Sequence, residues 1–248
     1  MNKTLPIVQP FFDEDSHTIS YVVWDPETHV SAIIDSVLDY HHKNITTDTK
    51  LADEIIAYIT KHNLTNAWIL ETHLHADHIS AVAYLKEKVG GKSGIGKEVL
   101  FVQKYLKETL ELKDTFQTDG SQFDKLFADG DTFNVGSMTA TAIHTPGHTP
   151  ADMIYDIGSV LFAGDTLLAP DSGTARCDFP GGSAETLYDS VQKILTTHNP
   201  DTSIYLCHDY PEGKNRGMMY QTTVVEERQS NIHVRDGISK DEFVKMRT

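Results

Sequence analysis

The segment ETHLHADHIS, residues 71–80, decides the fold of this chain. It places three histidines and an aspartate within six positions, directly after the apolar run AWIL. In extended backbone, side chains two positions apart point to the same side, so His73, His75 and Asp77 can converge. On a helix they would point apart. We therefore expect loop or extended chain up to Asp77, with a helix opening at Asp77 or His78. Imidazoles and carboxylates crowded in this way invite a metal ion.

Four predicted strand ends each deliver a candidate metal ligand to a turn. His73 and His75 follow NAWIL, His148 follows MTATAI, Asp165 closes SVLFAGD and His208 closes SIYLCHD. Strand ends are good platforms because the sheet fixes the backbone while the loop aims the side chain. A lone His or Asp at the end of a strand is usually a cap or a solvated residue. Here that explanation would require the same coincidence at four separate loops. We therefore predict a metal site made of His73, His75, Asp77, His78, His148, Asp165 and His208.

The other histidines fall into no such pattern. We interpret His144 as an ordinary strand residue, and we interpret as incidental the remaining ones: His17, His29, His41, His42, His62, His198 and His233. Two small residues support the ligand turns. Gly147 follows Pro146 in a tight turn before His148, and Gly164 lets the backbone approach closely before Asp165.

The composition of the 248 residues, 39% hydrophobic and 23% charged, is typical of a globular protein. The first 16 residues hold no continuous apolar segment of a secretory signal, and no apolar run approaches the ~18 residues that span a bilayer. Cys177 and Cys207 form no CxxC pair, which favours two reduced thiols. We therefore expect a cytoplasmic protein.

The formal net charge of −15 disfavours nucleic acids and anionic membranes as partners, because their binding relies on clustered Lys and Arg. It also means that an anionic substrate must meet a local basic patch.

Strand-like runs alternate with a few helices along the chain. Residues 21–25 and 31–36 indicate a hairpin, and helices are predicted over residues 51–64, 79–91 and 185–198. Residues 92–126 are the least legible, with one helix over 97–112. Strands are expected within 125–136, 138–145, 152–158, 159–165 and 203–209. This order predicts α/β or α+β layers, with helices covering both faces of the sheets.

At this point a family resemblance is clear. ETHLHADH resembles the HxHxDH signature of the metallo-β-lactamase superfamily, and HTPGHT, FAGDTL and CHDY are similar to its later ligand motifs, in the same order. The resemblance covers about residues 15–215. It implies a four-layer αββα sandwich with the metal at one edge of two packed sheets. We expect a single domain over 1–248, with residues 216–248 as a C-terminal extension.

Within the superfamily, the chain resembles the persulfide dioxygenases, which are related to glyoxalase II. ARCDFPGG followed by ETLYDSVQKIL is similar to their R-x-D-F segment and the helix after it, and VVEER followed by DEFVKM is similar to their C-terminal run. There are two departures. Residues 92–126 are longer than in compact members, which leaves the substrate open, and Cys177 stands where many members carry Thr. A longer helical region after HDY would be expected of glyoxalase II.

This resemblance implies one Fe(II) per chain, held by His73, His148 and Asp165, with the other four predicted ligands around it or in a second site. It implies that glutathione persulfide and O2 are converted to sulfite. For the carboxylates of glutathione it suggests Arg176, with Tyr210, Lys214 and Arg216 as further contacts. The alternative for Arg176 is a surface ion pair with Asp178. For Lys214 and Arg216 the alternative is that they lie in a solvated loop and bind no substrate.

Two other functions fit the same residues. A hydrolase with two Zn(II), bridged by Asp165 and acting on a glutathione thioester, shares every ligand. A metal-holding protein without turnover is the third reading. The sequence alone does not decide the metal count, and it is compatible with a homodimer.

Overall fold

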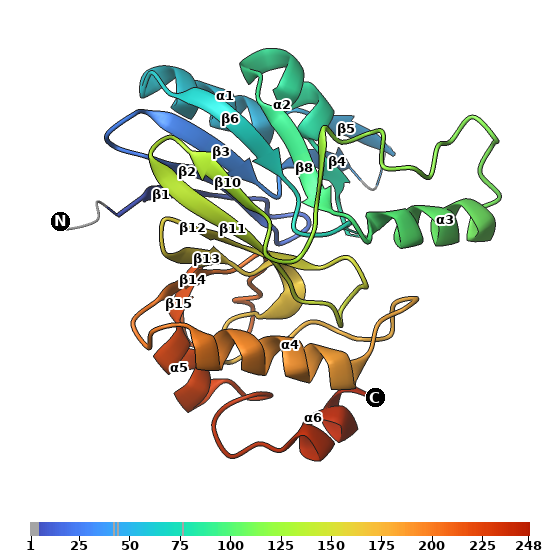
Figure 1. Cartoon of the computed structure of the whole chain (residues 1–248), viewed down its shortest axis with the longest axis vertical. Coiled ribbons are helices and arrows are strands. Elements are labelled where there is room, and N and C mark those ends of the chain that lie inside the picture. Colours follow the sequence, from blue (N-terminus) through green and yellow to red (C-terminus); the bar gives the residue numbers. More distant parts are fainter. Residues whose placement is uncertain (1–4, 42, 44, 76) are drawn as a thin grey trace.

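The computed structural model describes residues 5–41, 43, 45–75 and 77–248. Two six-stranded sheets pack face to face, and helices cover both outer faces (Figure 1). This four-layer αββα arrangement confirms the fold class expected from the sequence. His42 and the first four residues of the N-terminal stretch lie outside the described residues. No helix in the described part of the chain has the length and apolar character needed to cross a bilayer.

The first sheet has the order β1-β2-β3-β6-β8-β9. Its strands are β1 (Ile7–Phe12), β2 (Ile19–Trp24), β3 (Val30–Ile34), β6 (Thr65–Leu70), β8 (Lys92–Gly96) and β9 (Lys125–Phe127). Strands β2 and β3 pair antiparallel, which confirms the predicted hairpin, whereas β3, β6, β8 and β9 are parallel. The outer face is covered by α1 (Lys50–Lys61) and α2 (Val82–Val89), whose buried residues Ile55 and Leu85 pack against Ile33 and Ile69.

The second sheet has the order β10-β11-β12-β13-β14-β15. Its strands are β10 (Thr132–Val135), β11 (Met138–His144), β12 (Met153–Ile157), β13 (Val160–Phe162), β14 (Ser203–Tyr205) and β15 (Gln221–Thr223). Helices α4 (Ala184–Thr197) and α5 (Val224–Ser230) cover its outer face, and α6 (Lys240–Arg247) packs on α4 (Figure 1). In α4, Leu187, Val191 and Ile194 are fully buried at helical spacing, which gives the helix one apolar face toward the sheet.

The central core lies between the two sheets. Tyr21, Ile34 and Leu70 of the first sheet share one buried cluster with Tyr155 and Phe162 of the second. The rings of Tyr21 and Phe162 meet edge to face, with centroids 5.4 Å apart. Because alternate residues of a strand point to opposite faces, each sheet contributes every second side chain to this core. The packing brings the ends of β6, β11, β13 and β14 to one edge of the sandwich.

The predicted start of the second helix was wrong. Residues Ile79–Ser80 form strand β7, which pairs antiparallel with β4 (Val37–His41), and α2 begins only at Val82. Strands β7, β4 and β5 (Thr46–Asp48) form a small third sheet. The extended backbone lets the Ser80 hydroxyl donate to the buried carboxylate of Glu71, 2.9 Å away. A tertiary partner therefore overrides the local helical pattern here.

Residues 92–126 contain a strand that the sequence did not reveal. Lys92–Gly96 forms β8 between β6 and β9, although its sequence KSGIG carries two glycines, which are depleted in strands. The predicted helix is present as α3 (Val99–Thr109), and it projects from the side of the sandwich (Figure 1).

Candidate metal centre

Three predicted ligands from three distant turns meet at one edge of the sandwich. His73 follows β6, His148 follows β11, and Asp165 lies in the short 3₁₀ turn Gly164–Thr166 after β13. One ligand atom of each lies within 4.8 Å of the other two. From Oδ2 of Asp165, Nε2 of His148 is 3.4 Å away and Nε2 of His73 is 3.9 Å away. Two imidazoles and a carboxylate therefore face one point.

The imidazoles are oriented by carbonyl groups behind them. Nδ1 of His148 lies 2.7 Å from the carbonyl oxygen of Arg176, and Nδ1 of His208 lies 3.3 Å from that of His17. A carbonyl only accepts hydrogen bonds, so each Nδ1 carries the proton and each Nε2 keeps its lone pair. Those lone pairs face Asp165, whose Oδ1 is 3.4 Å from Nε2 of His208. This tautomer leaves Nε2 of both rings free to bind a metal.

At both predicted glycines, Gly147 and Gly164, a side chain would clash with a neighbouring residue. Gly164 has φ +51°, and a Cβ there would lie 2.6 Å from the hydroxyl of Thr72, which precedes His73. Gly147 has φ +146°, and a Cβ there would lie 2.4 Å from the backbone of Leu187 in α4. Both turns can therefore approach their neighbours only without a side chain.

The electrostatics of the cluster fit a cation. Burial, with the nearby imidazoles, holds the pKa of His73 well below its usual value, so the ring is neutral and its lone pair is available. Oδ1 of Asp165 is buried and has no hydrogen-bond partner among the described residues. A buried carboxylate oxygen without a donor is costly, and a divalent cation at this point would satisfy it.

A neighbouring half-site is formed by Asp77, His78 and His208. Nε2 of His208 lies 3.4 Å from Oδ2 of Asp77, and Nδ1 of His78 lies 3.6 Å from Oδ1. Burial, followed by the charge of His75, lowers the pKa of His78 to about 4. Its Nε2 is buried with no hydrogen-bond partner in the described part of the chain. These three donors do not close into a compact group like that of His73, His148 and Asp165 among the described residues.

His75 is not part of the group around Asp165. Its Nε2 lies 3.2 Å from Oδ1 of Asp35 and 3.4 Å from Oε2 of Glu71. Burial lowers the pKa of His75, but the two carboxylates outweigh burial and raise it well above its usual value. Asp35 also accepts hydrogen bonds from the amide and hydroxyl of Thr72, at 2.7 and 2.9 Å.

Sequence reasoning missed the roles of Asp35 and Glu71. Their only signal is position: Asp35 ends the run SAIID beside the strand NAWIL, and Glu71 opens the histidine motif. Both residues are buried. Buried carboxylates are normally paired, and that rule points to them once burial is known.

A cavity of about 410 Å³ opens directly onto the cluster. This volume suits a small-molecule ligand. Its walls include the predicted ligands Asp77, His148, Asp165 and His208, together with Leu168, Thr174, Ala175, Arg176, Phe179, Tyr210 and Arg247. The ring of Tyr210 stacks on that of His208, with centroids 6.1 Å apart. Burial and nearby carboxylates raise the pKa of Tyr210, so its hydroxyl stays protonated and can donate.

Of the predicted substrate contacts, Arg176 and Tyr210 line the cavity and Lys214 does not. Arg176 lines this cavity, as expected, but its guanidinium also pairs with Asp178 (Nη2 to Oδ2, 2.7 Å) and lies over the ring of Phe179. Lys214 does not line the cavity, and its ammonium lies 2.8 Å from Oδ1 of Asp171. The substrate roles of Arg176, Tyr210 and Lys214 stay predictions.

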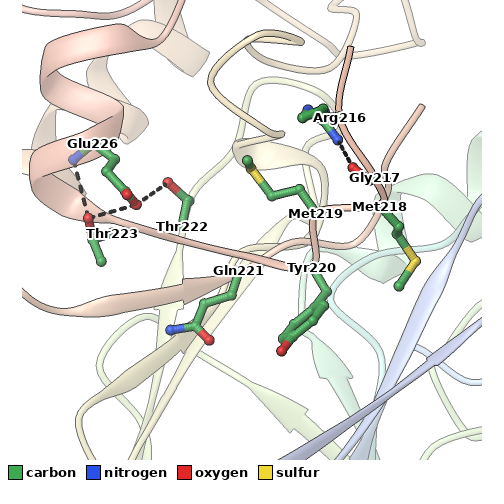
Figure 2. Close-up of a pocket in the computed structure, with 9 residues that line it drawn as sticks. All are labelled: Arg216, Gly217, Met218, Met219, Tyr220, Gln221, Thr222, Thr223 and Glu226. Carbon is green, nitrogen blue, oxygen red and sulfur yellow. Dashed lines mark hydrogen bonds between the residues drawn. The ribbon is translucent and has the colours of Figure 1, made fainter. Parts of the chain in front are cut away.

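Figure 2 shows a second, more open cavity of about 480 Å³, lined by residues 216–223 and Glu226. It contains no member of the metal cluster. Arg216 at its rim makes two 2.8 Å hydrogen bonds to the carboxylate of buried Asp209 and also pairs with Asp171. Arg216 is thus neither solvated nor free, and it braces the turn that carries His208.

Both cysteines are free and buried, which confirms the expected thiols. Burial raises the pKa of each thiol. Neither is therefore an activated nucleophile.

Comparison with known proteins identifies relatives over nearly the whole chain. The family profile described as Metallo-beta-lactamase superfamily matches residues 16–208. Glyoxylase B2 of Dictyostelium discoideum is 50% identical over 244 residues, which cover 97% of this chain and 82% of that protein. The mitochondrial persulfide dioxygenase ETHE1 of Mus musculus is 28% identical over 242 residues, covering 97% of this chain and 80% of that protein. The crystal structure of ETHE1 from Myxococcus xanthus has a TM-score of 0.77 and 29% identity, over 97% of this chain and 89% of that one.

Proposed function

The chain belongs to the metallo-beta-lactamase superfamily, and we propose that it is a persulfide dioxygenase that uses glutathione persulfide and one Fe(II) per chain. The observation that carries this proposal is the closed group of His73, His148 and Asp165. Two imidazoles and one carboxylate are the donor set of non-haem Fe(II) oxygenases, which leave positions open for two reactants. The resemblance to persulfide dioxygenases over most of the chain supports the same function.

The contacts of His75 differ from those of His73 and His148. Here it lies outside their group, and Asp35 and Glu71 hold its Nε2. Its Nδ1 is buried and has no hydrogen-bond partner among the described residues, so the proposal of one Fe(II) rests on the closed group of His73, His148 and Asp165.

When bound, Fe(II) would bring the persulfide sulfur and O2 together and let electron density pass from sulfur to oxygen. The balanced reaction consumes one glutathione persulfide, one O2 and one water, and yields one glutathione, one sulfite and two protons. The S–S bond breaks, and the two sulfur atoms together give up the four electrons that O2 accepts.

The residues of the cavity wall hold and shield the reactants. The hydroxyl of Tyr210 offers a donor to the substrate backbone beside His208. Phe179 packs edge to face on His148, with centroids 4.9 Å apart, and so covers one side of the ligand ring. Arg176 offers its guanidinium to a substrate carboxylate, in competition with Asp178. This competition predicts a modest contribution to affinity.

A second candidate function is a hydrolase with two Zn(II) that cleaves a glutathione thioester. It is favoured by the buried, unpartnered nitrogen atoms Nε2 of His78 and Nδ1 of His75, which no other described residue satisfies. The pair of Asp77 and His208 would complete the second site. The name of the 50% identical relative, Glyoxylase B2, points the same way.

Metal analysis and an oxygen electrode separate the two functions. The protein is purified anaerobically, loaded with Fe(II) and given glutathione persulfide. We expect about one iron per chain and one O2 consumed per sulfite formed, with both lost in His148→Ala. Two zinc ions per chain, thioester cleavage and no oxygen uptake would transfer the assignment to the hydrolase.

A further inference from the structure

Arg247, at the end of α6, lies in the wall of the cavity that opens onto the metal cluster. This position was not predictable from the sequence, because a long stretch of chain separates Arg247 from His208. Its Nε is buried and has no hydrogen-bond partner among the described residues. A buried guanidinium N–H without an acceptor is costly, and a ligand in the cavity could supply the acceptor.

The packing of α6 fixes where Arg247 points. Phe243 is fully buried in the cluster beneath the second sheet, and its ring lies 5.6 Å from that of Tyr188 in α4. Arg247 follows Phe243 by four positions, so both side chains lie on the same face of the helix. The helix start is held by a capping box between Ser239 and Glu242. Arg247 is thus presented by an anchored helix.

The other cations near the metal cluster are already matched by carboxylates. Arg176 pairs with Asp178, and Lys214 and Arg216 pair with Asp171. No carboxylate in the described part of the chain lies within ion-pair distance of Arg247. Arg176 and Arg247 are the two arginines in the described wall of this cavity. Arg247 faces the thiol of Cys177 and the ring of His233, neither of which is a carboxylate, so its charge is left for a ligand.

We propose that Arg247 binds a carboxylate of the substrate, while the sulfur of that substrate lies in the same cavity beside His148 and Asp165. This inference rests on the proposed function for the placement of the sulfur. It adds a second requirement, a carboxylate on the substrate. The cavity selects thiol derivatives that carry a carboxylate, and glutathione meets the requirement. A guanidinium can grip a carboxylate with two parallel hydrogen bonds, which Lys cannot reproduce.

The test measures binding with a probe that does not react. S-methylglutathione has no free thiol, and its diethyl ester lacks both carboxylates. Titration calorimetry on the metal-loaded protein compares the wild type with Arg247→Gln, Arg247→Lys and a matched control. The control is Arg228→Gln, because Arg228 is a half-exposed arginine of α5 that pairs with Asp236 away from the cavity.

We expect Arg247→Gln to raise the Kd for S-methylglutathione by about 10-fold or more, in line with the loss of a charge-assisted hydrogen bond. Arg247→Lys should raise it less, and Arg228→Gln should leave it unchanged. The diethyl ester should bind weakly and equally to all four proteins. An unchanged Kd in Arg247→Gln would overturn the proposal. So would an equal loss for the acid and the ester, which would indicate that Arg247 only supports the cavity wall.

Turnover separates this inference from the proposed function. If the enzyme consumes no O2 yet Arg247→Gln weakens S-methylglutathione alone, the function is wrong and the carboxylate site stands. If O2 uptake is normal and the KM of Arg247→Gln equals that of the wild type, the function stands and the site falls. In the wild type, S-methylglutathione should bind more tightly than its diethyl ester. This comparison tests the carboxylate requirement without any variant, so it holds even if Arg247→Gln folds poorly.

Discussion

Nδ1 of His148 donates a hydrogen bond to the backbone carbonyl of Arg176, across 2.7 Å. The loop that offers Arg176 to the cavity therefore also orients a candidate metal ligand. The backbone does the orienting, and the side chain faces the cavity. The two roles of this residue can be separated by experiment.

Replacing the side chain should affect substrate and leave the metal in place. We expect Arg176→Ala to keep the wild-type metal content, because the carbonyl that orients His148 remains. Its KM for glutathione persulfide should rise by about 3- to 10-fold, since Asp178 already competes for the guanidinium. Metal analysis and steady-state kinetics check this, with Asp178→Asn as the companion variant. Metal loss in Arg176→Ala would contradict it.

His75 gives a direct test of the ligand count. In His75→Gln, one iron per chain should remain, because His75 lies outside the group of three donors. The same change should lower the free energy of unfolding by about 3 kcal/mol, since Asp35 and Glu71 lose their buried partner. Denaturant titration and metal analysis of the same sample measure both effects. A fall in metal content to half that of the wild type would indicate a binuclear site.

Metal removal should lower stability in a reversible way. A cation that binds only the folded chain stabilises it by mass action, and it satisfies the buried oxygen of Asp165. We expect chelation to lower the thermal midpoint by on the order of 5–10 °C. Adding back Fe(II) under anaerobic conditions should restore it. An unchanged midpoint in a sample shown to be metal-free would mean that the cluster holds no tightly bound ion.

Glu227 in α5 lies outside the metal cluster, and we expect it to make the stability of the fold depend on pH. Burial raises the pKa of its carboxyl from 4.5 to about 8. Between these values the folded chain holds a proton that the unfolded chain has released, so stability falls as pH rises. Each pH unit in that window costs up to about 1.4 kcal/mol. Glu227→Gln should flatten this slope and be the more stable protein at pH 8, because Gln keeps an acceptor for the amide of Asn231. Parallel slopes in urea titrations from pH 5 to 8 would refute this.

The fold layers and the ligand turns were predictable because they depend on local patterns. Alternating apolar residues mark the strands, and the strand ends that carry His73, His148, Asp165 and His208 are visible in the sequence. The small strand Ile79–Ser80 was not predictable, because it exists only through its pairing with Val37 and Leu38. The strand Lys92–Gly96 was hidden for a similar reason, since its neighbours β6 and β9 impose the extended form.

The sequence by itself determined which donor groups are present, in what order, and at which strand ends they lie. Only the tertiary structure decided that His73, His148 and Asp165 close into one group while His75 turns to Asp35 and Glu71. It also decided that Arg247 reaches the same cavity. The physical reason is that periodicity fixes the side of an element on which a residue lies, whereas distances between elements follow from how two sheets and their helices pack.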